Sequence, residues 1–414
     1  MLSWLTRNIL DREEKIMAEW KKVKIGDIGK VITGKTPKTS NREYYGGSIP
    51  FLTPSDDMSV KYVRKTNKYI TEIGRVSVKN ATLPANAICV SCIGSDLGKV
   101  VITTQETVTN QQINSIIVDT DNYDVDYIYY SMLELGKILN FHSKTSTAVP
   151  IVNKSNFSQY EIDCPELNAQ KRIGTILSSI DKKIEENDRI NKNLEQQAMA
   201  IFNNAIEQSK SVTHVELGSL ADVKGGKRLP KGANLMSIPN SHPYIRVRDL
   251  NDVVFASLSA NYEYVDDETQ KTISRYITTT DDVLISIVGT IGLTAIVDKS
   301  LNMANLTENC VKVTNLHGIS PEYLLLYLRS QHGSEEIKKG TVGAVQAKLP
   351  IKNIQALSVP LLPQSDLQSL NDTLKVLFNQ LSINVAESKC LTDIRDSLLP
   401  KLMSGELDVS NLDL

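Results

Sequence analysis

The chain has 414 residues, 41% of them hydrophobic, and a formal net charge of −2 at pH 7. This length fits two or three domains with sizeable cores, while the near-neutral charge excludes a strong overall attraction to nucleic acid or to an anionic membrane. The five cysteines, an odd number in a chain of this size, form no disulfide framework and fit a reducing compartment. No stretch is long and apolar enough for a transmembrane helix, so we expect a cytoplasmic location without membrane contact.

The first segment, residues 1–16, has no counterpart elsewhere in the sequence. Its apolar stretch is interrupted by Arg7 and Asp11 and is too short for a signal peptide. Because Met17 is a more natural start, residues 1–16 are interpreted as an N-terminal extension or an upstream translation start.

From residue 17 onward the sequence contains a duplication. Residues 25–28 (IGDI) and the pair Gly34-Lys35 recur as residues 217–220 (LGSL) and Gly226-Lys227. Further equivalent segments are 49–51 and 242–244, 90–94 and 285–289, 126–127 and 322–323, and Thr145 and Thr341. A solenoid repeats every 20–50 residues or so, which is far shorter than this period. The sequence therefore contains two copies of one domain.

Each copy is predicted to begin with an α+β globular domain of about 150 residues. Short β-rich runs such as 87–93 and 282–288 alternate with polar loops, and Tyr and Leu recur at helical spacing around 125–139 and 321–337. The two globular domains are predicted over residues 17–167 and 211–362.

Each copy is predicted to end in a long helix, over residues 168–210 and 363–403, and a tail of residues 404–414 follows. Seam residues alternate at spacings of 3 and 4, a heptad pattern typical of coiled coils. The first seam contains Leu177, Ile180, Ile184, Asn187, Asn191, Leu194, Ala198 and Ile201. The second contains Leu367, Leu370, Leu374, Leu377, Leu381, Asn384, Ser388, Leu391, Arg395, Leu398 and Leu402.

The matching seams predict that the two helices form an antiparallel coiled coil with each other. Asn187 aligns with Asn384, and a polar seam residue costs stability but fixes register. A solvated helix face is the alternative. The predicted architecture is two pseudo-symmetric globular domains joined by this helical pair.

These segments resemble the specificity subunits of type I restriction–modification systems. The resemblance is carried by ILSSIDKKIEEN (176–187), AIF (200–202) and SLLPKLMSGEL (397–407). WKKVKIGDI (20–28) with GKTP (34–37) is similar to the start of a target recognition domain. The resemblance covers nearly the whole chain from Met17.

This resemblance implies that each globular domain is a target recognition domain for one half of a bipartite site in double-stranded DNA. The helices would act as a spacer of about one DNA turn, ~34 Å, and as a docking surface for two modification subunits. Those subunits would carry S-adenosylmethionine and methylate adenine N6. Restriction subunits, which translocate and cut DNA with ATP and Mg, can join. The chain itself would be non-catalytic and would bind no cofactor.

Two motifs suggest other chemistry but are interpreted as structural. Residues 29–36 (GKVITGKT) match the P-loop pattern, yet Pro37 follows where a helix is needed, and the second copy (221–228) keeps only Gly-Lys. Residues 89–92 (CVSC) form a lone C-x-x-C without a counterpart in the second copy, which favours a buried strand over zinc. No metal ligand or catalytic residue is assigned.

Candidate DNA-contacting residues lie in polar, basic loops. Lys and Arg contact phosphates, and bidentate Arg–guanine and Asn or Gln–adenine pairs recognise bases. Arg246 and Arg248 are expected to share one face of a strand, where a solvated charged face is equally compatible. The candidates are Lys35, Thr36, Lys38, Arg42, Lys144, Thr145, Lys227, Arg228, Lys231, Arg246, Arg248, Lys338, Lys339, Gln346 and Lys348. Residues 110–112 and 308–309 occupy similar positions in the two copies, but for these a turn-capping role is favoured.

Two other functions stay open at this point. A stand-alone scaffold would use the coiled coil to hold unrelated partners. An enzyme would need an NTPase site at residues 29–36 or a fused methyltransferase. The sequence contains neither Gly-x-Gly-x-x-Gly nor the Asn-Pro-Pro-aromatic motif that the resemblance leads us to expect in an adenine methyltransferase.

Overall fold

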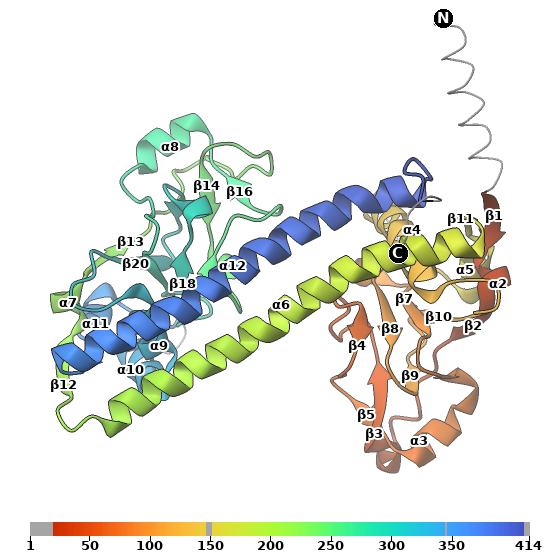
Figure 1. The fold of residues 1–414 in the computed structure, drawn as a ribbon, viewed down its shortest axis with the longest axis horizontal. Helices are drawn as coiled ribbons and strands as arrows, with labels where there is room; N and C mark the ends of the chain where they lie inside the picture. The colour runs from red at the N-terminus through yellow and green to blue at the C-terminus, as the bar shows by residue number, and fades with distance from the viewer. Residues whose placement is uncertain (1–19, 146–150, 344–345, 410–414) are drawn as a thin grey trace, which may run out of the picture. The chain divides into compact units, whose positions relative to one another are not determined.

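The computed structural model describes residues 20–145, 151–343 and 346–409 (Figure 1). The chain divides into two compact units, residues 1–186 with 387–414 (unit 1) and residues 187–386 (unit 2). Each unit contains one globular domain and part of each of two long helices. The predicted extension at residues 1–16 lies outside the described residues.

The globular domain of unit 1 is built on a five-stranded sheet of order β2-β10-β7-β8-β4. These strands are β2 (Gly29–Thr33), β10 (Ile113–Val118), β7 (Ile88–Ser91), β8 (Val100–Thr103) and β4 (Tyr62–Val63). A four-stranded sheet of order β5-β3-β9-β6 contains β5 (Tyr69–Ile70), β3 (Tyr45–Leu52), β9 (Thr107–Thr109) and β6 (Thr82–Leu83). β1 (Lys21–Lys24) pairs with β11 (Glu161–Cys164).

Four helices complete the globular domain of unit 1 among its described residues. They are α2 (Ile25–Ile28), α3 (Glu72–Ser77), α4 (Val125–Thr145) and α5 (Lys154–Gln159), with 3-10 turns η1 (Arg42–Tyr44), η2 (Lys79–Ala81) and η3 (Gly94–Asp96). Asp124 caps the start of α4, where its Oδ1 accepts a hydrogen bond of 2.9 Å from the Tyr127 amide.

Unit 2 is also built on a five-stranded sheet, but its second sheet has three strands instead of four. Its five-stranded sheet, of order β13-β20-β17-β18-β15, contains β13 (Asp222–Gly225), β20 (Cys310–Thr314), β17 (Val283–Ser286), β18 (Thr294–Val297) and β15 (Phe255–Ala256). A second sheet contains β16 (Glu263–Tyr264), β14 (Pro243–Ile245) and β19 (Asn305–Leu306), and β12 (Thr213–Glu216) pairs with β21 (Ser358–Leu361). The helices are α7 (Leu217–Leu220), α8 (Asp267–Ile273), α9 (Pro321–Arg329), α10 (Gln331–Gly340) and α11 (Ile351–Gln355), with η4 (Val247–Leu250) and η5 (Lys299–Leu301).

The strand orders of the two five-stranded sheets correspond one to one, which confirms the predicted duplication of an α+β domain. Equivalent tyrosines make equivalent bonds. Tyr127 on α4 donates a 2.5 Å hydrogen bond to the Asp163 carbonyl on β11, and Tyr323 on α9 donates one of 2.5 Å to the Pro360 carbonyl on β21. Both tyrosines are fully buried, so each phenol needs such a partner.

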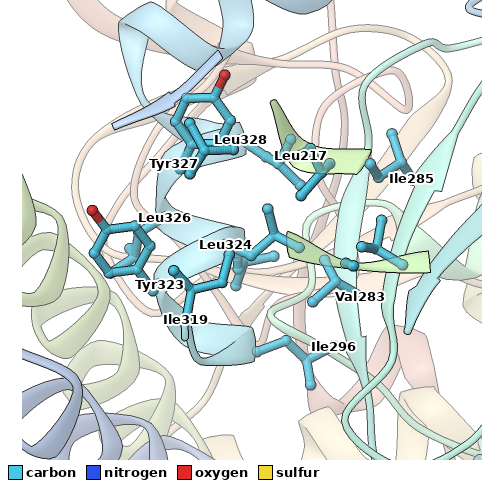
Figure 2. Packing of buried hydrophobic residues seen from close by; sticks show 14 of the residues in the cluster. Leu217, Val283, Ile285, Ile296, Ile319, Tyr323, Leu324, Leu326, Tyr327 and Leu328 are labelled. Atoms are coloured by element: carbon cyan, nitrogen blue, oxygen red, sulfur yellow. The ribbon is translucent and has the colours of Figure 1, made fainter. Parts of the chain in front are cut away.

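The central strands are apolar on both faces because each face of the sheet is covered. In β17, Val283 and Ile285 pack into the cluster that contains α9, whereas Leu284 belongs to a separate cluster with the second sheet. Figure 2 shows Leu324 of α9 on the side of the helix facing Val283. The Tyr323 ring lies on the opposite side of the helix. Alternating side chains of one strand therefore build two layers.

The long helices are α6 (Leu167–Gln208) and α12 (Gln364–Met403). In unit 1, Lys183 pairs with Glu387 at 3.2 Å and Asp181 pairs with Arg395 at 2.9 Å. As the residue number falls along α6 it rises along α12, so the helices run antiparallel, as predicted. α12 continues through Pro400, contrary to the usual helix-breaking effect of proline, and ends three residues later.

Most of the predicted seam is buried or partly buried. Leu177, Asn187, Leu374, Leu381 and Asn384 are buried, and Ile180, Ile184, Leu194, Leu377 and Leu391 are intermediate. The prediction for Ile201 is wrong, since this side chain is 37% exposed and Phe202 is buried in its place at 2%. The larger ring packs against Tyr323 with ring centres 5.0 Å apart. At this end of α6, the buried residue is therefore the one that packs against the globular domain of unit 2.

Two predicted helices differ from the observed ones. The helix expected over 125–139 extends to Thr145, so residues 143–145 are helical and not part of a loop. The helix expected over 321–337 is two helices, because Ser330 ends α9 and caps α10 by accepting a 3.2 Å bond from the Gly333 amide. As a result, Lys338 and Lys339 lie in the last turn of α10.

Candidate nucleic-acid interface

A loop that begins with glycine leaves the first strand of each main sheet and runs against a turn that precedes the neighbouring strand. We call these the Gly-Lys loop (34–38 and 226–231) and the facing turn (110–112 and 307–309). In unit 1 the Gly34 amide donates to the Ile113 carbonyl at 3.0 Å and the Lys35 amide to the Thr109 carbonyl at 2.8 Å. A Cβ at Gly34 would lie 2.1 Å from the Asn110 carbonyl oxygen, so only glycine permits this approach.

The same backbone contacts occur in unit 2. The Gly226 amide donates to the Cys310 carbonyl at 3.0 Å, and the Lys227 amide donates to the Leu306 carbonyl at 2.8 Å. A Cβ at Gly226 would lie 2.0 Å from the Thr307 carbonyl oxygen. The glycine of the repeated Gly-Lys pair is therefore a requirement of the backbone, which explains why glycine recurs at this position.

A third segment, the aspartate turn (53–56 and 246–249), adjoins the facing turn. In unit 1 the Thr53 amide donates to Asp56 Oδ2 at 2.7 Å, and in unit 2 the Arg246 amide donates to Asp249 Oδ2 at the same distance. The strand before each aspartate turn accepts a hydrogen bond of 3.1 Å from the facing turn, from Asn110 to Leu52 and from Thr307 to Ile245. Three segments distant in sequence thus form one backbone frame in each unit.

The side chains exposed around this frame in unit 1 are of two kinds: neutral polar groups, and cations that form no ion pair among the described residues. The Thr36 hydroxyl donates to Gln111 Oε1 at 2.7 Å, which joins the Gly-Lys loop to the facing turn. Lys35, Lys38 and Arg42 are exposed, and among the described residues none of the three forms an ion pair. This surface is suited to an anionic partner.

In unit 2 the equivalent bridge is ionic. Arg228 Nε donates to Glu308 Oε1 at 2.8 Å, and the Arg228 side chain is 82% exposed. Burial raises the pKa of the Glu308 carboxyl, but hydrogen bonds from Arg228 and Thr307 outweigh it and hold the pKa below its ordinary value. Glu308 is therefore ionised at neutral pH and fixes the guanidinium.

Arg246 and Arg248 do not lie on a strand, which corrects the prediction. Arg246 precedes η4 and Arg248 lies within it, because the Asp249 side chain accepts from the Arg246 amide and closes a helical turn. The two guanidinium groups nevertheless converge: both donate to Glu263 Oε2 on β16, Arg248 at 2.8 Å. Glu263 was missed because it is distant in sequence and no local pattern marks it.

The segment with Gln346 and Lys348 also adjoins the facing turn of unit 2. The Ile287 amide donates to the Asn309 carbonyl at 2.8 Å, and the Leu349 amide donates to the Ile287 carbonyl at 3.0 Å. Gln346 and Lys348 are both exposed. Their contact with DNA bases or phosphates stays a prediction.

The remaining candidates are Lys227, Lys231, Lys338, Lys339, Lys144 and Thr145. Lys227 Nζ lies 5.4 Å from the centre of the Tyr276 ring, a cation–π distance. Lys231, Lys338 and Lys339 are exposed, and Lys339 lies 3.6 Å from Glu336. Lys144 and Thr145 lie at the end of α4, and their side chains lie outside the described part of the structure.

The two alternative motifs have structural roles. Residues 29–33 of the P-loop pattern form β2, which pairs antiparallel with β10, and the next helical element is the three-residue η1. Cys89 and Cys92 are buried, and burial raises the pKa of Cys89 to about 12. Within residues 20–145, 151–343 and 346–409, no group of three or more His, Cys, Asp or Glu side chains could hold a metal ion. In the same ranges no helix has the length and apolarity to cross a membrane.

Comparison with known proteins identifies relatives of this architecture. A family model, the type I restriction modification DNA specificity domain, matches residues 17–196 and again residues 209–391. The MjaIX type I restriction enzyme specificity subunit of Methanocaldococcus jannaschii is 26% identical and covers 96% of each chain. The HindI specificity subunit of Haemophilus influenzae is 33% identical over 41% of this chain and 38% of that protein.

The fold also has a solved counterpart. The S subunit of a type I restriction-modification system from M. genitalium superimposes with a TM-score of 0.57 over 92% of this chain and 96% of that chain, at 17% identity. At that identity the likeness concerns the fold, with two α+β domains and two paired long helices. It agrees with the architecture predicted from the duplication and the seams.

Proposed function

We propose that this chain, which belongs to the family of type I restriction modification DNA specificity proteins, recognises an asymmetric, bipartite DNA site. Residues 17–167 would bind one half-site and residues 211–362 the other. The helical segments 168–210 and 363–403 would space the half-sites and bind partner subunits. The MjaIX and HindI relatives are specificity subunits of type I restriction enzymes.

One observation carries the proposal: the two units share a backbone frame and differ in the side chains that the frame exposes. Gly34 and Gly226 hold equivalent loops, whereas Thr36 and Gln111 in unit 1 correspond to Arg228 and Glu308 in unit 2. Two similar frames with different polar side chains are suited to two different base sequences, because base edges differ in their donors and acceptors.

Catalysis would belong to the partners. Two modification subunits would bind S-adenosylmethionine and methylate adenine N6, and restriction subunits would add ATP- and Mg-dependent translocation and cleavage. The chain itself would bind neither cofactor, and the assembly would act on cytoplasmic double-stranded DNA without membrane contact.

The proposal is tested by mapping N6-methyladenine across the host genome with and without this gene. Methylation of one asymmetric bipartite motif should disappear on deletion and return on complementation. Co-purification with the full-length chain should recover a methyltransferase subunit. If deletion leaves every methylated bipartite motif in place and only unrelated partners co-purify, a scaffold function would be supported instead.

A further inference from the structure

We propose that the equivalent bridges Thr36–Gln111 and Arg228–Glu308 are base-specificity determinants, with Gln111 contacting an adenine and Arg228 a guanine. The half-site of unit 2 would then contain a guanine that Arg228 recognises, and the half-site of unit 1 an adenine that Gln111 recognises. This inference rests on the proposed function and adds the residues and base classes to it.

The two bridges occupy the same position in their frames. Thr36 and Arg228 each follow the loop glycine by two residues, and Gln111 and Glu308 are each the second residue of the facing turn. Each pair joins the Gly-Lys loop to the facing turn through side chains, at 2.7 Å in unit 1 and 2.8 Å in unit 2. The position of the bridge is the same in both units, but a hydroxyl–amide pair in unit 1 is replaced by a guanidinium–carboxylate pair in unit 2.

Arg228 presents the donors that guanine requires. Its Nε is engaged by Glu308 Oε1, which leaves both terminal nitrogens at the end of a side chain that is 82% exposed. Guanine offers the O6 and N7 acceptors side by side in the major groove, and the terminal fork of an arginine can donate to both. Glu308 acts as a positioning residue, because it orients the fork without occupying it.

Gln111 presents the mixed pattern that adenine requires. Its Oε1 accepts from the Thr36 hydroxyl and retains a second lone pair, and its Nε2 keeps its N–H donors. Adenine offers N7 as an acceptor and its N6 amino group as a donor, which a glutamine amide matches with two bonds. Thr36 fixes the amide orientation in the way that Glu308 fixes Arg228.

A purely structural role explains these bridges less well. An exposed ion pair contributes little to folding, and the neutral bridge of unit 1 closes the same loop without charge. Two more arginines, Arg246 and Arg248, lie at the aspartate turn that adjoins the same facing turn, and both bind Glu263. A recognition role accounts for both the exposure and the exchange of chemistry.

The experiment maps the methylated motif in cells that express the complete system with variants of this chain. Arg228→Ala should relax one guanine position in one half-site, with discrimination falling about 10- to 100-fold, and leave the other half-site unchanged. Glu308→Gln should weaken the same position. Lys224→Ala is the matched control, since Lys224 is also an exposed cation ion-paired with a carboxylate, Asp222 at 3.0 Å; it should leave the motif intact.

Unit 1 provides the reciprocal test. Gln111→Ala should relax an adenine in the other half-site, and the double variant Thr36→Arg/Gln111→Glu should shift that position towards guanine. If Arg228→Ala abolishes all methylation, Arg228→Gln decides. A glutamine amide matches adenine and not guanine, so this variant should lose the guanine preference, and an unrelaxed guanine would overturn the inference. A wild-type motif that persists unchanged in the Arg228 and Gln111 variants overturns it as well. Absence of any bipartite motif in the wild type would instead refute the proposed function.

Discussion

A pair of buried amides lies in the helical seam of unit 2. Asn384 Nδ2 on α12 donates to Asn191 Oδ1 on α6 at 2.8 Å, and Gln380 Nε2 donates to Asn384 Oδ1 at 2.8 Å. Asn191 is 8% exposed and Asn384 4%, so neither amide can exchange its partner for bulk water. This pair fixes the register between the two helices at a cost in stability.

Removing one amide should therefore cost more than removing both. Asn384→Leu leaves the Asn191 carbonyl buried without its donor and should lower the free energy of unfolding by about 1–3 kcal/mol. The double variant Asn191→Leu/Asn384→Leu should recover most of this loss, because two apolar side chains then meet. Denaturant unfolding measures both. Asn379→Leu, at an exposed position of α12, is the control and should change stability by less than about 0.5 kcal/mol.

This account would be contradicted if the double variant lost as much stability as Asn191→Leu and Asn384→Leu lose together. The sequence placed polar residues in both seams and aligned Asn187 with Asn384 as equivalent positions of the two copies, but it did not identify Asn191 as the hydrogen-bond partner of Asn384. A heptad pattern identifies the face of a helix, and the partner residue depends on the axial register, which packing of the globular domain decides. For the same reason Glu263 and Gln111 could not be assigned as partners of specific side chains from local patterns.

At the scale of elements, the two units attach their globular domain to the long helices by different chemistry. In unit 1, Lys61 pairs with Asp126 at 2.7 Å, and the Tyr130 hydroxyl donates to Asp181 at 2.5 Å. Arg395 of α12 completes the chain of contacts at Asp181. In unit 2 an aromatic contact makes part of this attachment, with the Phe255 and Phe378 rings packed edge to face and their centres 6.3 Å apart. The ion pair there is looser, since Arg329 of α9 lies 3.6 Å from Glu195 of α6.

This difference predicts separate responses to substitution. Phe378→Ala removes a ring that is 3% exposed and should destabilise unit 2 by about 3–5 kcal/mol. Arg395→Met leaves Asp181 without its cation and should destabilise unit 1 by about 1–3 kcal/mol, since both side chains retain some exposure. Hydrogen exchange resolved by peptide distinguishes the units. Equal loss of protection in both units for either variant would contradict independent attachment.

The elements themselves were predicted unevenly. The long helices and the central strands β7 and β17 follow from periodicity and β-branched runs, because they are long or strongly apolar. The break at Ser330 between α9 and α10 was missed, although serine is a preferred N-cap residue. The strand order of the sheets was not predictable, because most strand pairs join residues far apart in sequence.

At the scale of the whole molecule, charge decides how the chain binds DNA. The net charge of −2 gives no general attraction to a polyanion, and three arginines of unit 2 (Arg228, Arg246 and Arg248) are paired with Glu308 or Glu263. Non-specific affinity comes from phosphates neutralised by Lys and Arg. The isolated chain should therefore distinguish sequences through base contacts while binding them weakly.

The measurable consequence is a large gain in affinity on assembly. In 150 mM salt the purified chain should bind its site with a Kd well above nanomolar, and addition of the modification subunit should tighten binding by orders of magnitude. The dependence of log K on log salt should steepen at the same time, since each added phosphate contact contributes about 0.9 to the slope. Arg228→Ala in the complex should leave that slope nearly unchanged while reducing discrimination at one position, because Arg228 is proposed to contact a base and not a phosphate. Nanomolar binding by the isolated chain at this salt concentration would refute the assignment of phosphate neutralisation to the partners.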